Sequence, residues 1–190
     1  MSPKKLMIPR FLRLIINKNI MEFLKLAKER YSCRMLTNRP VEQEKIDKII
    51  ECANYAPTGV NKQPFRLWLM QSADAVENIK KTTTYTFGAN LFLVVGGNPA
   101  EAWVRSFDNR NIADVDASIV ATHIMLAIHD LGLASTWVGK FDAPLLKTIY
   151  PEMADYDLIA IFPIGYPAEN AQPGPRHFTR KSVDEIVIKK

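Results

Sequence analysis

Two arginines and a serine occupy alternate positions where a first predicted helix ends: Arg30, Ser32 and Arg34. In an extended backbone, residues i, i+2 and i+4 share one face, so both guanidinium groups and the hydroxyl would point the same way. The planar guanidinium suits phosphate oxygens, and a serine adds a neutral donor. The spacing therefore predicts a cradle for one phosphate group. The alternative is an ordinary helix C-terminus, where cations are favoured in any case.

A second polar cluster lies in residues 56–65 (APTGVNKQPF), between a predicted helix and a predicted strand. Gly59 permits the close approach of a backbone, and Asn61 and Gln63 each offer both a donor and an acceptor. Such a turn can bind the edge of a heterocycle that carries carbonyls and ring nitrogens. The alternative is plain turn chemistry, because Pro, Gly and Asn dominate turns.

The remaining candidates for chemistry are weaker. His123 and His129 share one predicted helix, but at 3.6 residues per turn their spacing places them on different faces. Cys33 and Cys52 form no metal-ligand or C-x-x-C pattern, so we expect no metal site, no disulfide and a reduced, cytoplasmic protein. Residues 95–97 (VGG) do not form a G-x-G-x-x-G motif, so no separate dinucleotide-binding domain is predicted.

Helices and strands alternate irregularly, which predicts one layered α+β domain over residues 20–190 rather than a repeating βαβ fold. Apolar residues at helical spacing, or in short runs between breakers, give the elements. The expected helices cover residues 20–30, 41–56, 73–81, 112–131 and 142–150, and the expected strands cover 65–71, 91–97, 134–138 and 157–163. Helix 112–131 becomes apolar nearly all round toward its C-terminal half, so we expect it in a core or a subunit interface. Ser182-x-x-Glu185 predicts a capping box before a last short turn.

The net charge of +5 comes from the N-terminus of this 190-residue chain. Residues 1–19 contain five bases and no acid, and the rest of the chain is neutral, which argues against a nucleic-acid partner. The apolar stretch 6–16 is too short to span a bilayer and lacks a cleavage site, so we expect no membrane anchor and no secretory signal. Residues 1–19 are interpreted as an extension: a disordered, solvated arm, an arm that touches a membrane or a partner, or untranslated residues before a start at Met21.

The two polar motifs, in this order, resemble the FMN-dependent nitroreductase family. The resemblance rests on R-x-S-x-R (30–34) and A-P-T-x-x-N-x-Q-P (56–64), and it continues through segments 131–133 (LGL), 136–139 (TWVG), 163–167 (PIGYP) and 180–187 (RKSVDEIV). It covers residues 21–187. It implies an α+β fold with a central, largely antiparallel sheet flanked by helices. It also implies an intertwined homodimer with two FMN sites at the subunit interface, in which helix 112–131 belongs to the dimer core.

The resemblance also implies which residues bind FMN. The phosphate and the ribityl chain would be held by Arg30, Ser32 and Arg34, joined by Arg180 and Lys181. The flavin or its ribityl hydroxyls would be met, partly from the partner subunit, by Pro57, Thr58, Asn61 and Gln63. Along the ring would lie Thr136, Trp137, Val138 and Gly139. Because the flavin carries the chemistry, no protein residue is assigned as an obligatory acid or base.

The implied activity is that of an NAD(P)H-dependent oxidoreductase, which reduces a nitroaromatic, a quinone or another electron-poor small molecule by a ping-pong mechanism. Alternatives with the same fold are reductive dehalogenation, oxygen-dependent flavin cleavage, and flavin binding without catalysis. Trp103 and Arg105 lie in the variable middle region that shapes the substrate mouth in this family. Trp103 could stack on a planar substrate and Arg105 could attract an anionic one. The alternative for this pair is a peripheral packing cluster.

Overall fold

The computed structural model describes residues 22–190 of the chain, which is divided into two compact units, Met1–Arg30 and Tyr31–Lys190. In the described part of the first unit, residues 22–29 are helical, as the sequence predicts. Every other element belongs to the second unit. The extension predicted over residues 1–19 lies outside the described residues, and the predicted domain boundaries stay predictions.

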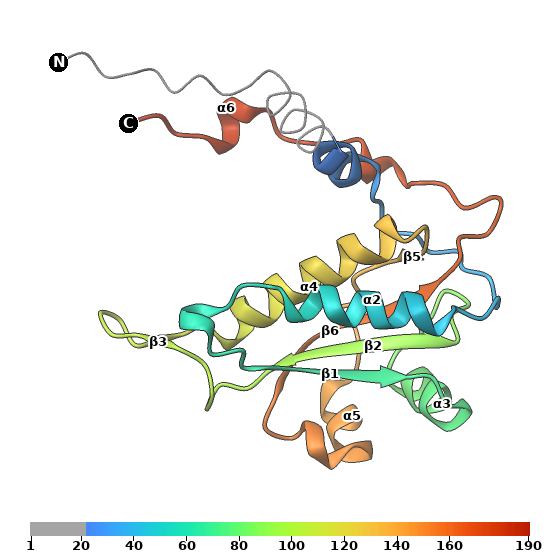
Figure 1. The fold of residues 1–190 in the computed structure, drawn as a ribbon, viewed down its shortest axis with the longest axis horizontal. Coiled ribbons are helices and arrows are strands. Elements are labelled where there is room, and N and C mark those ends of the chain that lie inside the picture. Colours follow the sequence, from blue (N-terminus) through green and yellow to red (C-terminus); the bar gives the residue numbers. More distant parts are fainter. Residues whose placement is uncertain (1–21) are drawn as a thin grey trace. The chain divides into compact units, whose positions relative to one another are not determined.

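The second unit is built on an antiparallel sheet, which has four strands in the described residues, in the order β1-β2-β6-β5 (Figure 1). The strands are β1 (Phe65–Met70), β2 (Leu91–Gly97), β5 (Ala134–Ser135) and β6 (Asp157–Gly165). Each neighbouring pair is antiparallel, which confirms the predicted sheet. The central strand β2 is buried along its whole length because both of its faces are covered.

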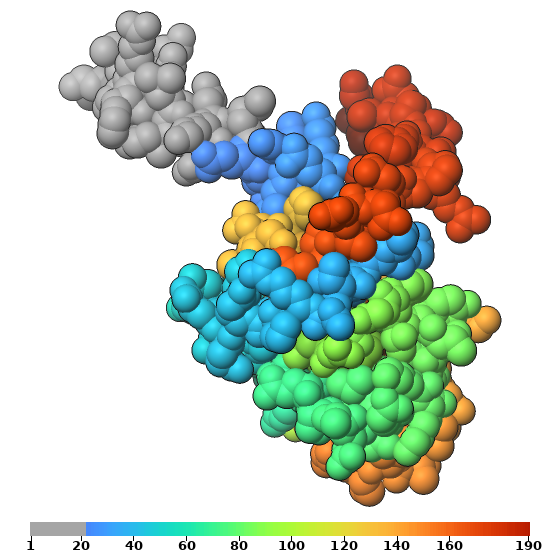
Figure 2. Space-filling model, turned by 90° about the vertical axis from the view of Figure 1, so that its right-hand side faces the viewer, coloured from blue at the N-terminus to red at the C-terminus, as the bar shows by residue number. Residues whose placement is uncertain are grey.

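Helices cover both faces of this sheet, as Figure 1 shows. One face carries α2 (Gln43–Asn54) and α4 (Ala113–Asp130), and the other carries α3 (Ala73–Thr82) and α5 (Ala143–Ile149). Figure 2 shows the side of the unit where the segment leading into α2 (light blue) lies next to α3 and the loop after it (green).

Alternation along β2 supplies both cores, because successive side chains of a strand point to opposite faces. Leu91, Leu93 and Val95 pack against α2 and α4, whereas Phe92 and Val94 pack toward α3 and α5. Each fully buried side chain of this size contributes about 1.5–3 kcal/mol relative to an exposed one. The strand therefore fixes the position of all four helices.

The long helix α4 uses its apolar surface unevenly. Its sheet side is fully buried, with Val120 and Ile124 at 0% exposure. Ile119 and Met125 are only partly buried, and Val115 is 42% exposed. The apolar residues of α4 therefore pack into the core on one side of the helix and form a half-buried apolar row on another side.

The strand predicted over 134–138 is interrupted. β5 ends at Ser135, and pairing resumes only at Val138, which exchanges two hydrogen bonds with Ile161. The register of β5 with β6 would set Thr136 opposite Pro163, and proline has no N–H to donate to the Thr136 carbonyl. Because of this break, the backbone of Thr136 is outside the hydrogen-bonded pairing of β5 with β6.

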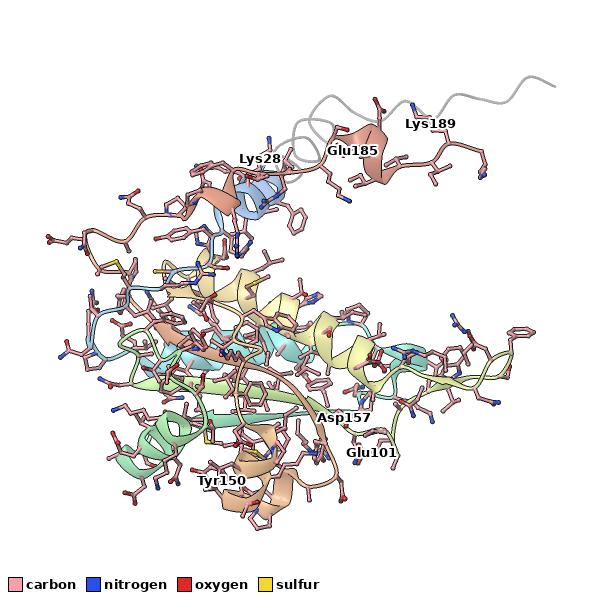
Figure 3. All side chains as sticks on the ribbon, turned by 180° about the vertical axis from the view of Figure 1, so that it is seen from behind. Lys28, Glu101, Tyr150, Asp157, Glu185 and Lys189 are labelled. Atoms are coloured by element: carbon pink, nitrogen blue, oxygen red, sulfur yellow. The ribbon has the colours of Figure 1, made fainter. Side chains whose placement is uncertain are left out.

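Two small elements complete the unit. The hairpin of β3 (Val104–Arg105) and β4 (Arg110–Asn111) forms its own two-stranded sheet. The last helix, α6 (Val183–Ile186), begins with the predicted capping box, in which the Ser182 N–H donates to Oε2 of Glu185 at 2.7 Å. This bond lowers the pKa of Glu185, a residue labelled in Figure 3.

Candidate functional site

The segment that follows Arg30 lies beside β5 and the end of β6. The Cys33 N–H donates to the Ser135 carbonyl at 2.9 Å. Cys33 is buried, and because neighbours in an extended backbone point to opposite sides, Ser32 and Arg34 share the outward face. Two of the three residues predicted to bind a phosphate are therefore on one face. Arg30 belongs to the first unit, and its role stays a prediction.

Arg34 lines a cavity of about 180 Å³ together with residues from two other segments. The loop after α3 and the stretch after β5 contribute Tyr85, Phe87, Thr136, Trp137, Val138, Gly139 and Lys140. The structure thus brings Arg34 next to all four residues predicted to lie along a flavin ring. Trp137 is fixed by edge-on packing against Phe162, with 5.5 Å between the ring centroids.

The chemistry of this cavity suits a planar ring with an anionic tail. Its lining combines the Arg34 guanidinium and the Lys140 ammonium group with aromatic and aliphatic surface, and it contains no carboxylate. Thr136, whose backbone is outside the pairing with β6, also lines the cavity. The volume is below the range of about 300–1,000 Å³ that ligand pockets usually have. By itself this cavity is smaller than a ligand of flavin size needs.

The second polar motif, the loop 57–63, is held at the start of α4. The Gly59 N–H donates to Oδ1 of Asp116, in the first turn of α4, at 2.9 Å. The loop leads into β1, whereas the cavity-lining stretch 136–139 follows β5, and β1 and β5 are the two edge strands of the sheet. No residue of the loop 57–63 lines the Arg34 cavity of the same chain.

Three residues without the freedom of glycine adopt left-handed backbone angles in this loop: Val60 (φ 44°), Asn61 (φ 57°) and Gln63 (φ 51°). Each costs on the order of 1–3 kcal/mol unless its surroundings fix it. The Gln63 N–H donates to the Thr58 hydroxyl at 3.0 Å, and the Gln63 amide donates to Oδ1 of Asn61 at 3.1 Å. Strain of this kind clusters at ligand-binding sites, which favours a binding role over plain turn chemistry.

Asp116 is a residue of this region that the sequence reasoning missed. It is 1% exposed, and its Oδ2 has no hydrogen-bond partner among residues 22–190. Burial of a carboxyl group is costly without partners, so its bond to Gly59 fixes the loop to α4. An acidic residue within a strongly apolar helix is the signal that could have found it. Tyr85, Phe87 and Lys140 were also missed, because neither the loop after α3 nor the connection between β5 and α5 has a periodic pattern.

Two predicted phosphate ligands, Arg180 and Lys181, are exposed and do not line the Arg34 cavity. The Arg180 guanidinium donates to the carbonyls of Arg176 at 3.2 Å and Thr179 at 2.8 Å. Their contact with a phosphate group stays a prediction.

The two candidates for a substrate mouth lie near the loop 57–63. Trp103 is half-buried, and its Cβ is 3.2 Å from the place that a Cβ on Gly59 would take. Arg105 is on the β3–β4 hairpin, where its Nε donates to Oδ1 of Asp108 at 2.7 Å. This bond raises the pKa of Arg105 and lowers that of Asp108. The Arg105 charge is thus balanced locally.

Residues 22–190 offer little for other kinds of site. No group of three or more His, Cys, Asp and Glu side chains there could hold a metal ion. None of the helices in that part of the chain has the length and apolar character needed to cross a membrane. Cys33 and Cys52 are free thiols, and burial, with the charges of Asp130 and Glu51, raises the pKa of Cys52.

Comparison with known sequences gives a family match. The model of the nitroreductase family matches residues 27–86 and 80–166. A Methanothermobacter thermautotrophicus protein, assigned as an NADH dehydrogenase/NAD(P)H nitroreductase, is 28% identical over 82% of this chain and 82% of its own length. An iodotyrosine deiodinase of Nematostella vectensis is 22% identical over 92% of this chain and 77% of its own length.

Solved structures share the fold. A nitroreductase family protein of Clostridium difficile 630 is 37% identical, with a TM-score of 0.81 over 87% of this chain and 96% of that one. A Desulfovibrio desulfuricans protein, assigned as a nitroreductase and solved in complex with FMN, is 24% identical, with a TM-score of 0.73 over 88% and 95% of the two chains. The family model extends over the whole sheet, the Arg34 cavity and the loop 57–63, so the match is to the fold rather than to one motif, and this chain belongs to the nitroreductase family.

Proposed function

We propose that this protein is an FMN-dependent oxidoreductase that uses NAD(P)H to reduce nitroaromatics, quinones or other electron-poor small molecules. The observation that carries the proposal is the cavity in which Arg34 meets the stretch 136–139, since these residues are far apart in sequence and are expected to bind one cofactor. The assignment of the Methanothermobacter relative as an NAD(P)H nitroreductase and the FMN bound by the Desulfovibrio protein support it.

The residues of this chain fit FMN. Arg34 offers a planar, permanently charged partner for the phosphate, with the Ser32 hydroxyl on the same face. Trp137 and Val138 offer apolar surface for the ring, and Thr136 lines the same cavity. In this proposal Arg30, Arg180 and Lys181 add to the phosphate site.

Bound FMN supplies the redox chemistry, which is transfer of a hydride from NAD(P)H and then of electrons to an acceptor in ping-pong order. The task of the protein is to bind, orient and shield. Arg34 neutralises the phosphate, and Trp137 keeps water from one side of the ring because its indole is packed against Phe162. The cavity lining contains no carboxylate or imidazole, which supports the view that no side chain is an obligatory acid or base.

We propose further that the active form is a homodimer with each site completed by the partner subunit. The loop 57–63 leads into β1, at the other edge of the sheet from β5, and does not line the Arg34 cavity of its own chain. A partner whose loop 57–63 covers the cavity would bring Pro57, Thr58, Asn61 and Gln63 to the cofactor, and the half-buried row of α4 is suited to the interface. The free thiols of Cys33 and Cys52 support a cytoplasmic location.

Reductive dehalogenation is the second candidate function. The similarity to an iodotyrosine deiodinase over 92% of this chain favours it over flavin cleavage and over flavin binding without catalysis. Nitroreduction and dehalogenation differ in their acceptor and not in the cofactor. Product analysis after mixing reduced protein with a nitroaromatic, a quinone and an iodophenol, under nitrogen and under air, distinguishes them, and the arm under air also detects flavin cleavage.

The test of the proposed function is the absorption spectrum of the purified protein before and after anaerobic addition of NADH or NADPH. We expect a yellow protein with bound FMN, whose flavin bands bleach with at least one nucleotide. A protein that binds FMN but is bleached by neither nucleotide would be a flavin-binding protein without this activity. A protein that binds no FMN would contradict the proposal as a whole.

A further inference from the structure

A larger cavity, of about 560 Å³, adjoins the Arg34 cavity. The two share Tyr85, Gly139 and Lys140 as lining residues. The larger one is formed by the last turn of α3, the threonines after it and the residues that lead into α5. Its volume is within the range of about 300–1,000 Å³ that is typical of small-molecule sites. It is therefore the place where a molecule that reacts in the Arg34 cavity has room for its remaining parts.

This second cavity is positively charged. Lys80, Lys81 and Lys140 line it, against one carboxylate, that of Asp142. Oδ1 of Asp142 already accepts the Leu145 N–H at 2.9 Å and so caps α5. The one acidic side chain of the lining is thus committed to the fold.

Two of the three ammonium groups have no acidic partner among the described residues. Lys80 is paired with Glu77 at 2.6 Å. Lys81 donates to the neutral amide oxygen of Asn78 at 2.8 Å, and Nζ of Lys140 is 5.8 Å from the ring centroid of Tyr85. Within residues 22–190, neither of these two lysines takes part in an ion pair. Their charge is available to an anionic ligand.

We propose that this lysine-lined cavity binds the phosphate groups of the reduced nicotinamide dinucleotide and makes the protein prefer NADPH to NADH. The inference deepens the proposed function and rests on it. To transfer a hydride, the nicotinamide ring must lie against the flavin ring, and the phosphates of the dinucleotide extend away from it. Because Tyr85, Gly139 and Lys140 line both cavities, the phosphates of a dinucleotide that reaches a flavin in the Arg34 cavity would lie in the adjoining one. The 2′-phosphate of NADPH adds negative charge that NADH lacks, and ammonium groups bind phosphates as point charges.

The experiment compares wild-type protein with Lys81→Gln, Lys140→Gln and the double variant. NADP⁺ and NAD⁺ are titrated by calorimetry, because the oxidised nucleotides bind without reducing a flavin. We expect each substitution to weaken NADP⁺ binding roughly tenfold, the order of one charge-assisted hydrogen bond, and to weaken NAD⁺ binding less. The dependence of NADP⁺ affinity on salt flattens in the double variant.

Lys48→Gln is the matched control. Lys48 is exposed on α2 and paired with Glu44, so the control removes the same charge away from the cavity. It leaves NADP⁺ affinity unchanged. Anaerobic mixing of Lys81→Gln with NADPH then gives a higher apparent Kd for flavin bleaching, with the limiting rate of bleaching preserved, because Lys81 does not line the Arg34 cavity.

Three results would overturn the inference. The first is an NADP⁺ affinity in the double variant equal to that of wild type, and the second is an equal loss in Lys48→Gln. The third is a Lys140→Gln protein that loses FMN and, once reconstituted with FMN, binds NADP⁺ as wild type does, because the cavity would then belong to the flavin. If neither nucleotide bleaches the wild-type flavin, the proposed function is wrong. The calorimetric titration still measures NADP⁺ binding to the cavity, so it distinguishes a failure of the proposed function from a failure of this inference.

Discussion

Arg34 is the residue on which the proposed phosphate site depends most directly. Replacement by alanine removes a charge-assisted, bidentate contact of about 1.5–3 kcal/mol, which corresponds to an FMN affinity lower by roughly 10- to 100-fold. We expect Arg34→Ala to purify as a colourless, folded protein, checked by fluorescence titration with FMN and by circular dichroism. Arg66→Ala, an exposed arginine on β1, is the control and keeps its flavin. Unchanged FMN affinity in Arg34→Ala would remove Arg34 from the site.

Gly59, in the loop 57–63, has little room for a side chain. A Cβ there would come within 2.6 Å of Cδ1 of Ile112 and 3.2 Å of Cβ of Trp103. We expect Gly59→Ala to lower stability by about 1–3 kcal/mol, as overpacking does, and to weaken FMN binding because the loop shifts. Thermal unfolding and FMN titration measure both effects.

Gly174→Ala is the control for this prediction, since nothing lies within 4 Å of the added methyl group. Its stability and FMN affinity match wild type. If Gly59→Ala behaves like Gly174→Ala in both measurements, the packing around the loop is looser than the contacts of Gly59 imply.

At the scale of elements, Tyr166 joins the end of the sheet to the start of α2. Its hydroxyl donates to Oε2 of Glu42, and Nζ of Lys45 lies 3.1 Å from the same hydroxyl. The Arg39 guanidinium stacks 3.9 Å above the ring. The bond from Tyr166, with smaller contributions that include Arg39, lowers the pKa of Glu42 from 4.5 to about 2.

This junction has a predictable pH dependence. A carboxyl group whose pKa is lower in the folded than in the unfolded state stabilises the fold above the unfolded pKa, and the contribution is lost as the pH falls. We expect the stability that Glu42 adds to decline between pH 4.5 and about 2. Tyr166→Phe raises the pKa of Glu42, so its melting temperature falls less steeply over that interval than that of wild type.

Tyr150→Phe is the control for the junction. Tyr150, labelled in Figure 3, accepts a hydrogen bond from the Asn78 amide at 3.1 Å, a neutral partner rather than a carboxylate. The variant loses the same hydroxyl, yet its melting temperature follows the pH as wild type does. Parallel curves for wild type and Tyr166→Phe would show that Tyr166 does not control the pKa of Glu42.

The sequence predicts most elements because their patterns are local. The helix expected over 112–131 is α4, and the strand expected over 91–97 is β2, because an apolar run between breakers determines each one. The strand expected over 134–138 is present at both ends but interrupted at 136–137 for a non-local reason. Its partner Pro163 is far away in sequence, and only the register of β5 with β6 reveals that it faces Thr136.

The residues of the candidate site likewise divide into those that local motifs mark and those that depend on contacts distant in sequence. The residues within short motifs, such as Arg34 and Asn61, are predictable because their side-chain chemistry can be read at fixed spacing. Tyr85 and Asp116 act through partners distant in sequence, the Arg34 cavity and Gly59 respectively. No local pattern marks such a contact, so these two residues require the fold.

At the scale of the whole molecule, the two polar motifs raise a question of assembly. The loop 57–63 leads into one edge strand of the sheet and the Arg34 cavity lies at the other edge, yet both carry groups suited to one flavin. A symmetric pair of chains resolves this, because in a twofold dimer the loop of each chain can serve the cavity of the other. The arrangement predicts that two defective chains restore a site when they are combined.

Subunit mixing tests this arrangement. Arg34→Ala damages the cavity and Asn61→Ala damages the loop, so each homodimer has two impaired sites and binds FMN weakly. If the two variants are unfolded, mixed and refolded together, half of the dimers are mixed, and each of these has one intact site and one doubly impaired site. About a quarter of all sites then bind FMN with wild-type affinity, a fraction measured by fluorescence titration. If Arg34 and Asn61 of the same chain served one site, every site in a mixed dimer would carry one of the two substitutions, and no tight fraction would appear.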